Sequence, residues 1–185
     1  PGRITFTELN ASLTNLTNDS LVLKKKGTMS VNATTKLMGQ GKISATFDFN
    51  LNSEVSSFSG KAHLDRFDPT LLNEFTEPVS FVRIKKGIIS KGDVSFEANK
   101  YYGLGDARVL YKNLHIDFLN KTDPEKQGMG IIMKNFLANR VVNTNNPHFF
   151  ITKEGDVFSR RDTTRAIFNY WVKLGMSGVV SSMGI

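Results

Sequence analysis

The chain contains no cysteine, which excludes disulfide bonds, thiolate metal sites and cysteine nucleophiles. Signatures of several enzyme classes are missing as well. No glycine-rich phosphate loop separates an expected strand from an expected helix, and no Gly-x-Ser-x-Gly motif occurs. No signal peptide is visible at the start, which is Pro1 rather than methionine. We therefore expect a fragment of a longer protein without an active site of these classes.

Long apolar runs are also missing. Residues 166–185 form the most apolar stretch, but Asn169, Lys173 and several Ser and Gly residues interrupt it. A membrane span needs about 20 mainly apolar residues. We interpret the helix expected within this stretch as amphipathic and packed on the rest of the protein, with a helix lying in a bilayer interface as the alternative.

The charge is unbalanced, with 24 lysines and arginines against 17 aspartates and glutamates, a formal net charge of +7. This excess suits an anionic membrane surface or a nucleic acid, and equally a soluble basic surface. Aromatic residues alternate with polar ones as core positions do, and no aromatic RNA-binding string of the RNP type occurs. We expect no nucleic-acid partner.

Alternation of apolar and polar residues is the dominant pattern in the sequence. Over residues 41–51, apolar side chains occupy every second position from Ile43 to Leu51. This period is typical of a strand with one face on a core and the other in water. Further strands are expected over residues 4–13 (bulged near 7–8), 21–26, 29–37, 58–64, 79–86, 88–98 and 106–119, with a turn at Gly103–Gly105 and a pair of short strands within 149–158.

Three segments predict helices. Asp68 can cap a short helix whose first position is Pro69 and which Pro78 should end. Residues 128–142 have apolar residues near helical spacing, and a last helix should start at Asp162 or Thr163 and reach Leu174. Residues 175–185 carry no clear pattern.

Together these segments predict a mainly β fold with a few helices. We expect a large, curved, mostly antiparallel meander sheet, groove-like in shape and covered by one short helix and two longer ones. Residues 1–120 should form the sheet, with the short helix near 68–76. Residues 121–185 should form a helix–strand–helix segment that packs on the sheet as part of one structural unit.

A His-x-Asp pattern occurs twice, at His63/Asp65 and at His115/Asp117. Residues i and i+2 share a face of a strand, so each pair could ligate a metal or form a base with its orienting carboxylate, as in a metal-dependent hydrolase. The residue between them is apolar in both cases, which places His and Asp on the solvent face. We interpret them as solvated polar residues and predict no catalytic residue, no metal and no cofactor.

Three runs of sequence resemble a known family. Residues 67–75 are FDPTLLNEF, residues 82–96 are VRIKKGIISKGDVSF and residues 103–116 are GLGDARVLYKNLHI, and residues 146–150, 160–162 and 167–173 near the end of the chain fit as well. They resemble the C-terminal region of AsmA-like bacterial envelope proteins of the AsmA and TamB type, above all the Bacteroidota version.

The resemblance implies a periplasmic β-structure, anchored in the inner membrane through an N-terminal segment missing from this chain. It implies a sheet curled around an apolar groove that conducts phospholipid, and a role in outer-membrane lipid homeostasis or assembly. Phospholipid or a membrane surface would then be the partner, together with other envelope proteins. An alternative from another class is a structural or protein-binding β-domain without lipid cargo.

The apolar face supplies the candidate site. We predict that lipid contacts Ile43, Phe47, Phe49, Phe58, Leu64, Val94 and Phe96. The alternative is an ordinary core beneath the helices at 68–75 and 128–142. Lys24, Lys25 and Lys26 are candidates for headgroup contact, or else a solvated strand end that discourages edge pairing.

Overall fold

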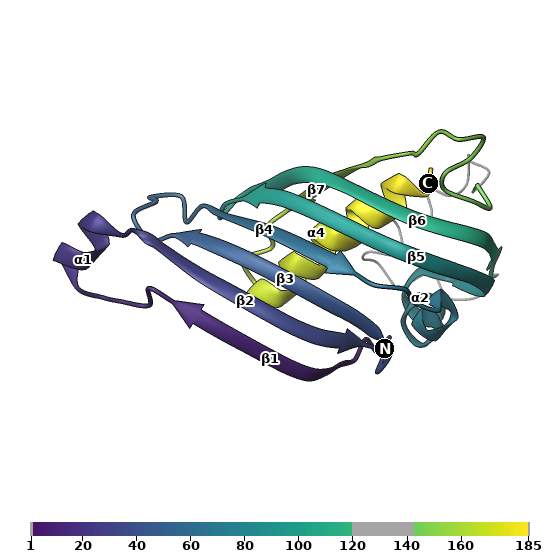
Figure 1. Ribbon diagram of the computed structural model, residues 1–185, viewed down its shortest axis with the longest axis horizontal. Helices are drawn as coiled ribbons and strands as arrows, with labels where there is room; N and C mark the ends of the chain where they lie inside the picture. Colours follow the sequence, from purple (N-terminus) through teal and green to yellow (C-terminus); the bar gives the residue numbers. More distant parts are fainter. Residues whose placement is uncertain (1, 120–142, 185) are drawn as a thin grey trace.

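A computed structural model describes residues 2–119 and 143–184. It confirms the mainly β fold: seven antiparallel strands form one open sheet whose order follows the chain (Figure 1). The strands are β1 (Phe6–Thr14), β2 (Thr28–Leu37), β3 (Gly41–Asn50), β4 (Phe58–Leu64), β5 (Val82–Ala98), β6 (Tyr102–Phe118) and β7 (Gly155–Arg160). The helices are α1 (Ser20–Lys25), the 3-10 helix η1 (Pro69–Leu72), α2 (Asn73–Ser80) and α4 (Ile167–Ser182).

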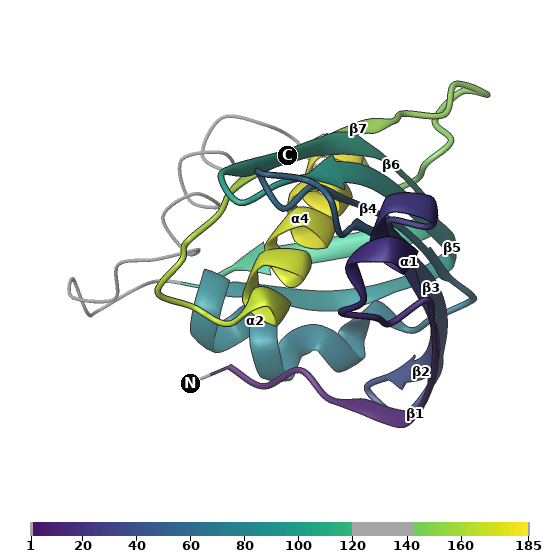
Figure 2. The same cartoon turned by 90° about the vertical axis from the view of Figure 1, so that its left-hand side faces the viewer.

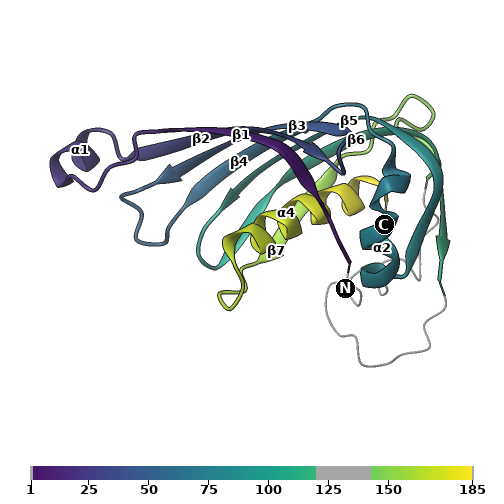
Figure 3. The same cartoon turned by 90° about the horizontal axis from the view of Figure 1, so that it is seen from below.

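The sheet is curved, and its concave side holds the helices that cover it. Figure 2 shows the strands arching around α4, which lies beside β6 and β7. Figure 3 shows α2 on the same side of the sheet, at the end opposite to α1. The expected helix over residues 128–142 lies outside the described residues.

The backbone of α4 lies directly on β6 and β7. A Cβ atom at Gly178 would lie 2.6 Å from both Ala107 Cβ and Val157 Cγ2, so glycine permits this close approach. Leu174 and Tyr170, on the same helix, are almost fully buried. The C-terminal helix is therefore part of the core.

A second buried cluster lies at the α2 end of the sheet, around Phe67, Ile89 and Tyr111. Asn146 fixes the following segment to it. Its backbone bonds to Tyr111 in both directions at 2.9 Å, and its side-chain amide donates to Val109 O and Lys153 O at 2.7 and 2.9 Å.

Two expectations about strands were confirmed in detail. The first strand is bulged, with a register shift between Thr7 and Asn10. Residues 29–37 and 41–51 pair as β2 and β3, joined by a tight turn.

The expected strand over residues 21–26 is wrong, because this segment is the helix α1. Asp19 Oδ1 accepts hydrogen bonds from the backbone N–H groups of Leu21 and Val22, at 2.8 and 3.3 Å, which caps the helix. Lys24 and Lys25 lie in its last turn, where positive charge is favourable. The hydrogen bonds of this cap favour a helix, although the residues that follow Asp19 have the pattern of a strand.

The expected boundaries around the short helix are also wrong. Pro78 does not end α2 but lies inside it, and the helix continues to Ser80 before the left-handed Phe81 (φ 56°). The strand expected over 79–86 therefore starts at Val82. It does not stop at Lys85–Gly87, because bulges let β5 continue for 17 residues.

The turn expected at Gly103 and Gly105 lies earlier in the chain. Asn99 Oδ1 accepts hydrogen bonds from the backbone N–H groups of Tyr101 and Tyr102, at 2.8 and 3.1 Å, and this side chain closes the turn. Both glycines lie within β6. A Cβ at Gly105 would overlap with Ser95 O and lie 2.6 Å from Phe96 Cα, so the close approach of the β5 backbone explains this glycine.

The segment after residue 148 differs from the expected pair of short strands. Phe149 and Phe150 form a tight turn with left-handed backbone, closed by hydrogen bonds between His148 and Ile151, and only β7 follows. Asp162 caps a turn through Thr164 N at 3.0 Å rather than the last helix, which begins at Ile167.

Helix α4 also continues past Leu174 to Ser182, through residues that carried no clear pattern. Ser177 and Ser182 bond their hydroxyls to carbonyls three residues earlier, at 2.8 Å. The packing of α4 on the sheet, including the close approach at Gly178, outweighs the low helix propensity of Gly and Ser.

Candidate functional site

The seven predicted lipid-contact residues lie on one face of three neighbouring strands. Antiparallel pairing sets Ile43 opposite Leu64, and Phe49 opposite Phe58. The next pairing sets Gly60 opposite Phe96, and Ala62 opposite Val94. Because alternate residues of a strand share a face, Phe47 belongs to the same surface. Sequence alternation therefore identified a real, continuous apolar face, which is the concave one.

Over β4 to β7 this face is covered. Phe58 and Phe96 are buried in one cluster with Tyr170 and Leu174 of α4, and Val94 packs against that cluster. Leu64 packs against the second cluster, near α2. Phe47 and Phe49 are partly buried against the first cluster in the same way as Val94. Six of the seven predicted residues thus pack in or against the two clusters, as the alternative interpretation required, and Ile43 is the exception.

Trp171 marks the limit of the covered part. Its indole stacks on Phe47 with ring centroids 4.4 Å apart, and lies 6.2 Å from the Phe49 ring. Phe47 and Phe49 are only partly buried despite these contacts. The edge of α4 therefore falls over β3.

Over β1, β2 and most of β3 the described residues cover the same face only near the α2 end, where Leu37 packs against the second cluster and Phe6 contacts Phe168 of α4. No residue of β1 or β2 is buried, and Leu13 is 53% exposed. We call this region the uncovered apolar surface; its large side chains are Leu13, Met29, Val31, Ile43, Phe47 and Phe49. Leu13, Val31 and Phe47 are aligned across the three strands by the register.

The two ends of the uncovered apolar surface differ. At one end Phe6 of β1 meets Phe168 of α4 edge to face, with centroids 5.4 Å apart. The other end, where Thr14 and Thr28 flank α1, carries the three predicted headgroup residues. Lys24 and Lys25 belong to the last turn of α1 and Lys26 is its C-cap, and all three are exposed. The structure thus puts cationic groups at one end of an apolar strip.

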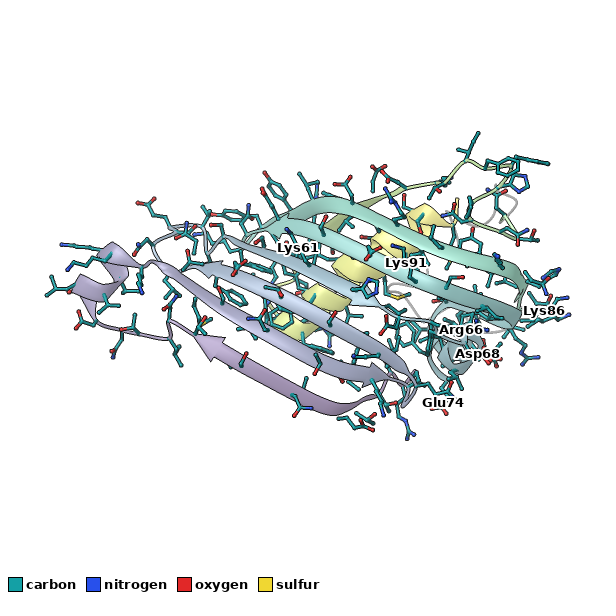
Figure 4. The ribbon with its side chains drawn as sticks, in the orientation of Figure 1. Lys61, Arg66, Asp68, Glu74, Lys86 and Lys91 are labelled. Carbon is teal, nitrogen blue, oxygen red and sulfur yellow. The ribbon has the colours of Figure 1, made fainter. Side chains whose placement is uncertain are left out.

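The convex face is polar. Figure 4 shows this face with α4 behind the sheet, and labels Lys61 and Lys91 on it. A shallow depression there is lined by Asn32, Thr46, His63, Asp93, Ser95 and Arg108, among others. Its lining includes no Phe, Tyr or Trp side chain.

His63 is the best-connected titratable group of that depression. Its Nδ1 lies 2.5 Å from Asp93 Oδ1 and its Nε2 lies 3.3 Å from Asp65 Oδ1. The hydrogen bond with Asp93, the largest cause, raises the pKa of His63 above 6.5, and the same bond lowers the pKa of Asp93. Lys91 also pairs with Asp93 at 3.3 Å. The contacts form a surface charge network.

The two His-x-Asp pairs do not meet. Asp93, the partner of His63, faces Arg108 on β6, whereas His115 lies seven residues further along that strand, roughly 23 Å away at the usual rise. His115 Nδ1 contacts Asn113 O, and Asp117 pairs with Lys85. Among the described residues no group of three or more His, Cys, Asp or Glu could hold a metal ion.

The sequence prediction of the lining lacks two features of the site. Met29 and Val31 share the apolar face of β2 and belong to the surface, and their alternation with polar residues is the signal that could have found them. The contact between Trp171 and Phe47 has no signal in the sequence.

In the part of the chain that the structure describes, no helix is long and apolar enough to cross a membrane. Comparison with protein-family models, curated proteins and solved structures finds no match for this chain.

Proposed function

We propose that this chain is a non-enzymatic, AsmA-like module of the bacterial cell envelope that binds phospholipid on its uncovered apolar surface. One observation carries the proposal. The apolar face is continuous across the sheet, yet its buried hydrophobic side chains lie over β4 to β7, while β1 and β2 contain no buried residue and β3 buries only Gly41. An ordinary core would bury this face throughout, because exposed apolar area forgoes about 25 cal/mol per Å².

The shape and chemistry of the strip suit an acyl chain. The ten residues of β2 give it a length of roughly 33 Å, and each CH₂ group of a ligand that leaves water contributes about 0.8 kcal/mol. The lysines at the α1 end suit a phosphate headgroup. This arrangement supports a lipid lying along β2 with its headgroup near Lys24–Lys26. The periplasmic location, and a role in conducting lipid or assisting outer-membrane assembly, are the part of the proposal that rests on the sequence resemblance alone.

The second candidate is a structural or protein-binding β-domain. One observation favours it: β1 is the edge of the sheet, so among the described strands nothing pairs with its outer side. A partner strand added there would extend the sheet. The first function requires the apolar surface itself to bind a ligand, whereas the second does not.

Trp171 provides the test, because it is the only tryptophan and stacks on the edge of the surface. A brominated fatty acid titrated into the 185-residue chain should quench Trp171 emission saturably. Val31→Asp puts a carboxylate on the surface and should weaken binding about tenfold or more, or about 1.4 kcal/mol.

Asn32→Asp is the matched control. It adds the same charge one residue away on the opposite face, where Asn32 Oδ1 accepts a hydrogen bond from Thr46 Oγ1, so binding should change less than about twofold. Absence of saturable quenching would refute lipid binding at this surface. So would an equal loss of affinity in both variants, provided that both are as stable as the unchanged protein.

A further inference from the structure

Helix α1 has an unusual surface for a short connecting helix. It is six residues long and buries none of them. Leu21 is 68% exposed, Leu16 just before the helix is 73% exposed, and Val22 is exposed as well. These apolar side chains therefore take no part in the core that the structure describes.

The fold nevertheless holds α1 in place. An isolated helix of this length is marginal in water. Asp19 caps it, Asn52 Nδ2 donates to Leu23 O at 2.9 Å, and Leu51 N donates to Gly27 O at 2.7 Å. Polar bonds thus fix the helix to the β3–β4 turn while its apolar side chains face solvent.

The charge of the same segment is strongly positive. Lys24, Lys25 and Lys26 are exposed, and no ion pair involves them within the described residues. Residues three or four apart are neighbours on a helix, so Leu21 adjoins Lys24 and Lys25, and Val22 adjoins Lys26. Favourable placement at the helix C-terminus explains lysines there, but it does not explain the exposed leucines beside them.

We propose that the α1 patch, formed by Leu16, Leu21, Val22, Lys24, Lys25 and Lys26, docks the protein on an anionic bilayer surface. Apolar side chains that enter the interface and lysines that meet acidic headgroups are the two signals that peripheral attachment requires. The patch lies at the far end of the sheet from α2 (Figures 1 and 3). Docking there brings the headgroup end of the uncovered apolar surface to the bilayer; in this respect the inference rests on the proposed function.

Vesicle flotation of the 185-residue chain tests the docking. The protein should float with vesicles that contain about a third phosphatidylglycerol, and not with pure phosphatidylcholine. A lysine near an anionic surface contributes about 1 kcal/mol, or about fivefold in affinity. Lys24→Gln, Lys25→Gln and Lys26→Gln combined should therefore weaken binding about a hundredfold, and Leu21→Ser with Val22→Ser at least tenfold.

Two controls remove general charge and general hydrophobicity as explanations. Lys42→Gln, Lys61→Gln and Lys86→Gln combined make the same change of net charge at exposed lysines on other elements. Phe149→Ser with Phe150→Ser removes exposed apolar side chains from a different turn. Both should keep binding within about fivefold. Equal losses in a control and its α1 counterpart, or no flotation of the unchanged protein, would overturn the proposal.

The same variants separate the two proposals. The informative variant is Leu21→Ser with Val22→Ser, because neither residue belongs to the proposed lipid site. If it no longer floats but still shows Trp171 quenching by a soluble brominated fatty acid, it has lost docking alone. Flotation that depends on the α1 patch, without any quenching, would leave docking established and the lipid-binding function refuted. A protein partner in place of a bilayer would leave flotation absent throughout, which overturns the docking.

Discussion

The contact between α4 and β6–β7 determines how much of the apolar face is covered, and two glycines of the helix test it. In Gly178→Ala the new Cβ would lie 2.6 Å from Ala107 Cβ and from Val157 Cγ2. In Gly175→Ala, three residues earlier, the new Cβ would have no neighbour within 4 Å. The two substitutions are chemically identical and lie in the same helix.

The expected magnitudes follow from this comparison. Alanine in place of glycine inside a helix gains about 1 kcal/mol at either site, so Gly175→Ala should stabilise the protein by about that amount. Carbon atoms normally approach to about 3.5–4.0 Å, so at Gly178 the neighbours must move by roughly 1 Å, and overpacking of this kind costs about 1–3 kcal/mol. The helix-propensity gain cancels in the difference, leaving Gly178→Ala about 1–3 kcal/mol less stable than Gly175→Ala.

Urea unfolding monitored by circular dichroism measures this difference. With a slope of about 2 kcal/mol per molar urea, the midpoint of Gly178→Ala should lie about 0.5–1.5 M below that of Gly175→Ala. Equal midpoints would refute the close packing of α4 on the sheet, and with it the boundary between covered and uncovered apolar surface.

Two further predictions concern the polar contacts. Asn146→Ala removes three buried or partly buried side-chain hydrogen bonds of about 1 kcal/mol each, so it should lower the free energy of unfolding by about 2–4 kcal/mol. Asn145→Ala changes a more exposed position and should cost less than about 1 kcal/mol. Equal losses of the two variants in thermal unfolding would contradict this role of Asn146. Because the pKa of His63 is raised in the folded protein, its bond to Asp93 stabilises the fold fully below pH 6.5, the unfolded value, and this contribution is lost as pH rises through the folded pKa. NMR titration of the ring should therefore give a midpoint above 6.5. His63→Ala should lower the free energy of unfolding by at most about 1 kcal/mol at this exposed pair, and this loss should shrink at alkaline pH; a loss that grows with pH would contradict the assignment.

The apolar face could be predicted from the sequence, because the alternation over residues 41–51 indicates both a strand and the face that Phe47 and Phe49 share. The mainly β class could be predicted for the same reason. Strand ends were less predictable, because they depend on single side-chain contacts such as Asn99 closing its turn and Asp19 capping α1. Such contacts have no periodicity from which they could be inferred.

What covers the apolar face could not be predicted, because it depends on contacts between residues far apart in the chain. Glycine and serine after Leu174 argue against a helix by propensity, yet Gly178 is the residue that lets α4 lie on Val157. Leu13 is exposed on the edge strand β1, whereas Phe96 is buried on the inner strand β5, where it packs in one cluster with α4. Alternation of apolar and polar residues occurs in both strands and does not distinguish them.

The central claim is that the uncovered apolar surface holds a lipid, and analysis of lipids that co-purify with the protein tests it most directly. The unchanged chain, expressed in a bacterial envelope and examined by native mass spectrometry and lipid extraction, should carry bound phospholipid. Val31→Asp should lose this lipid, and Asn32→Asp should keep it. A folded, lipid-free protein, or bound lipid that is unaffected by Val31→Asp, would contradict the account.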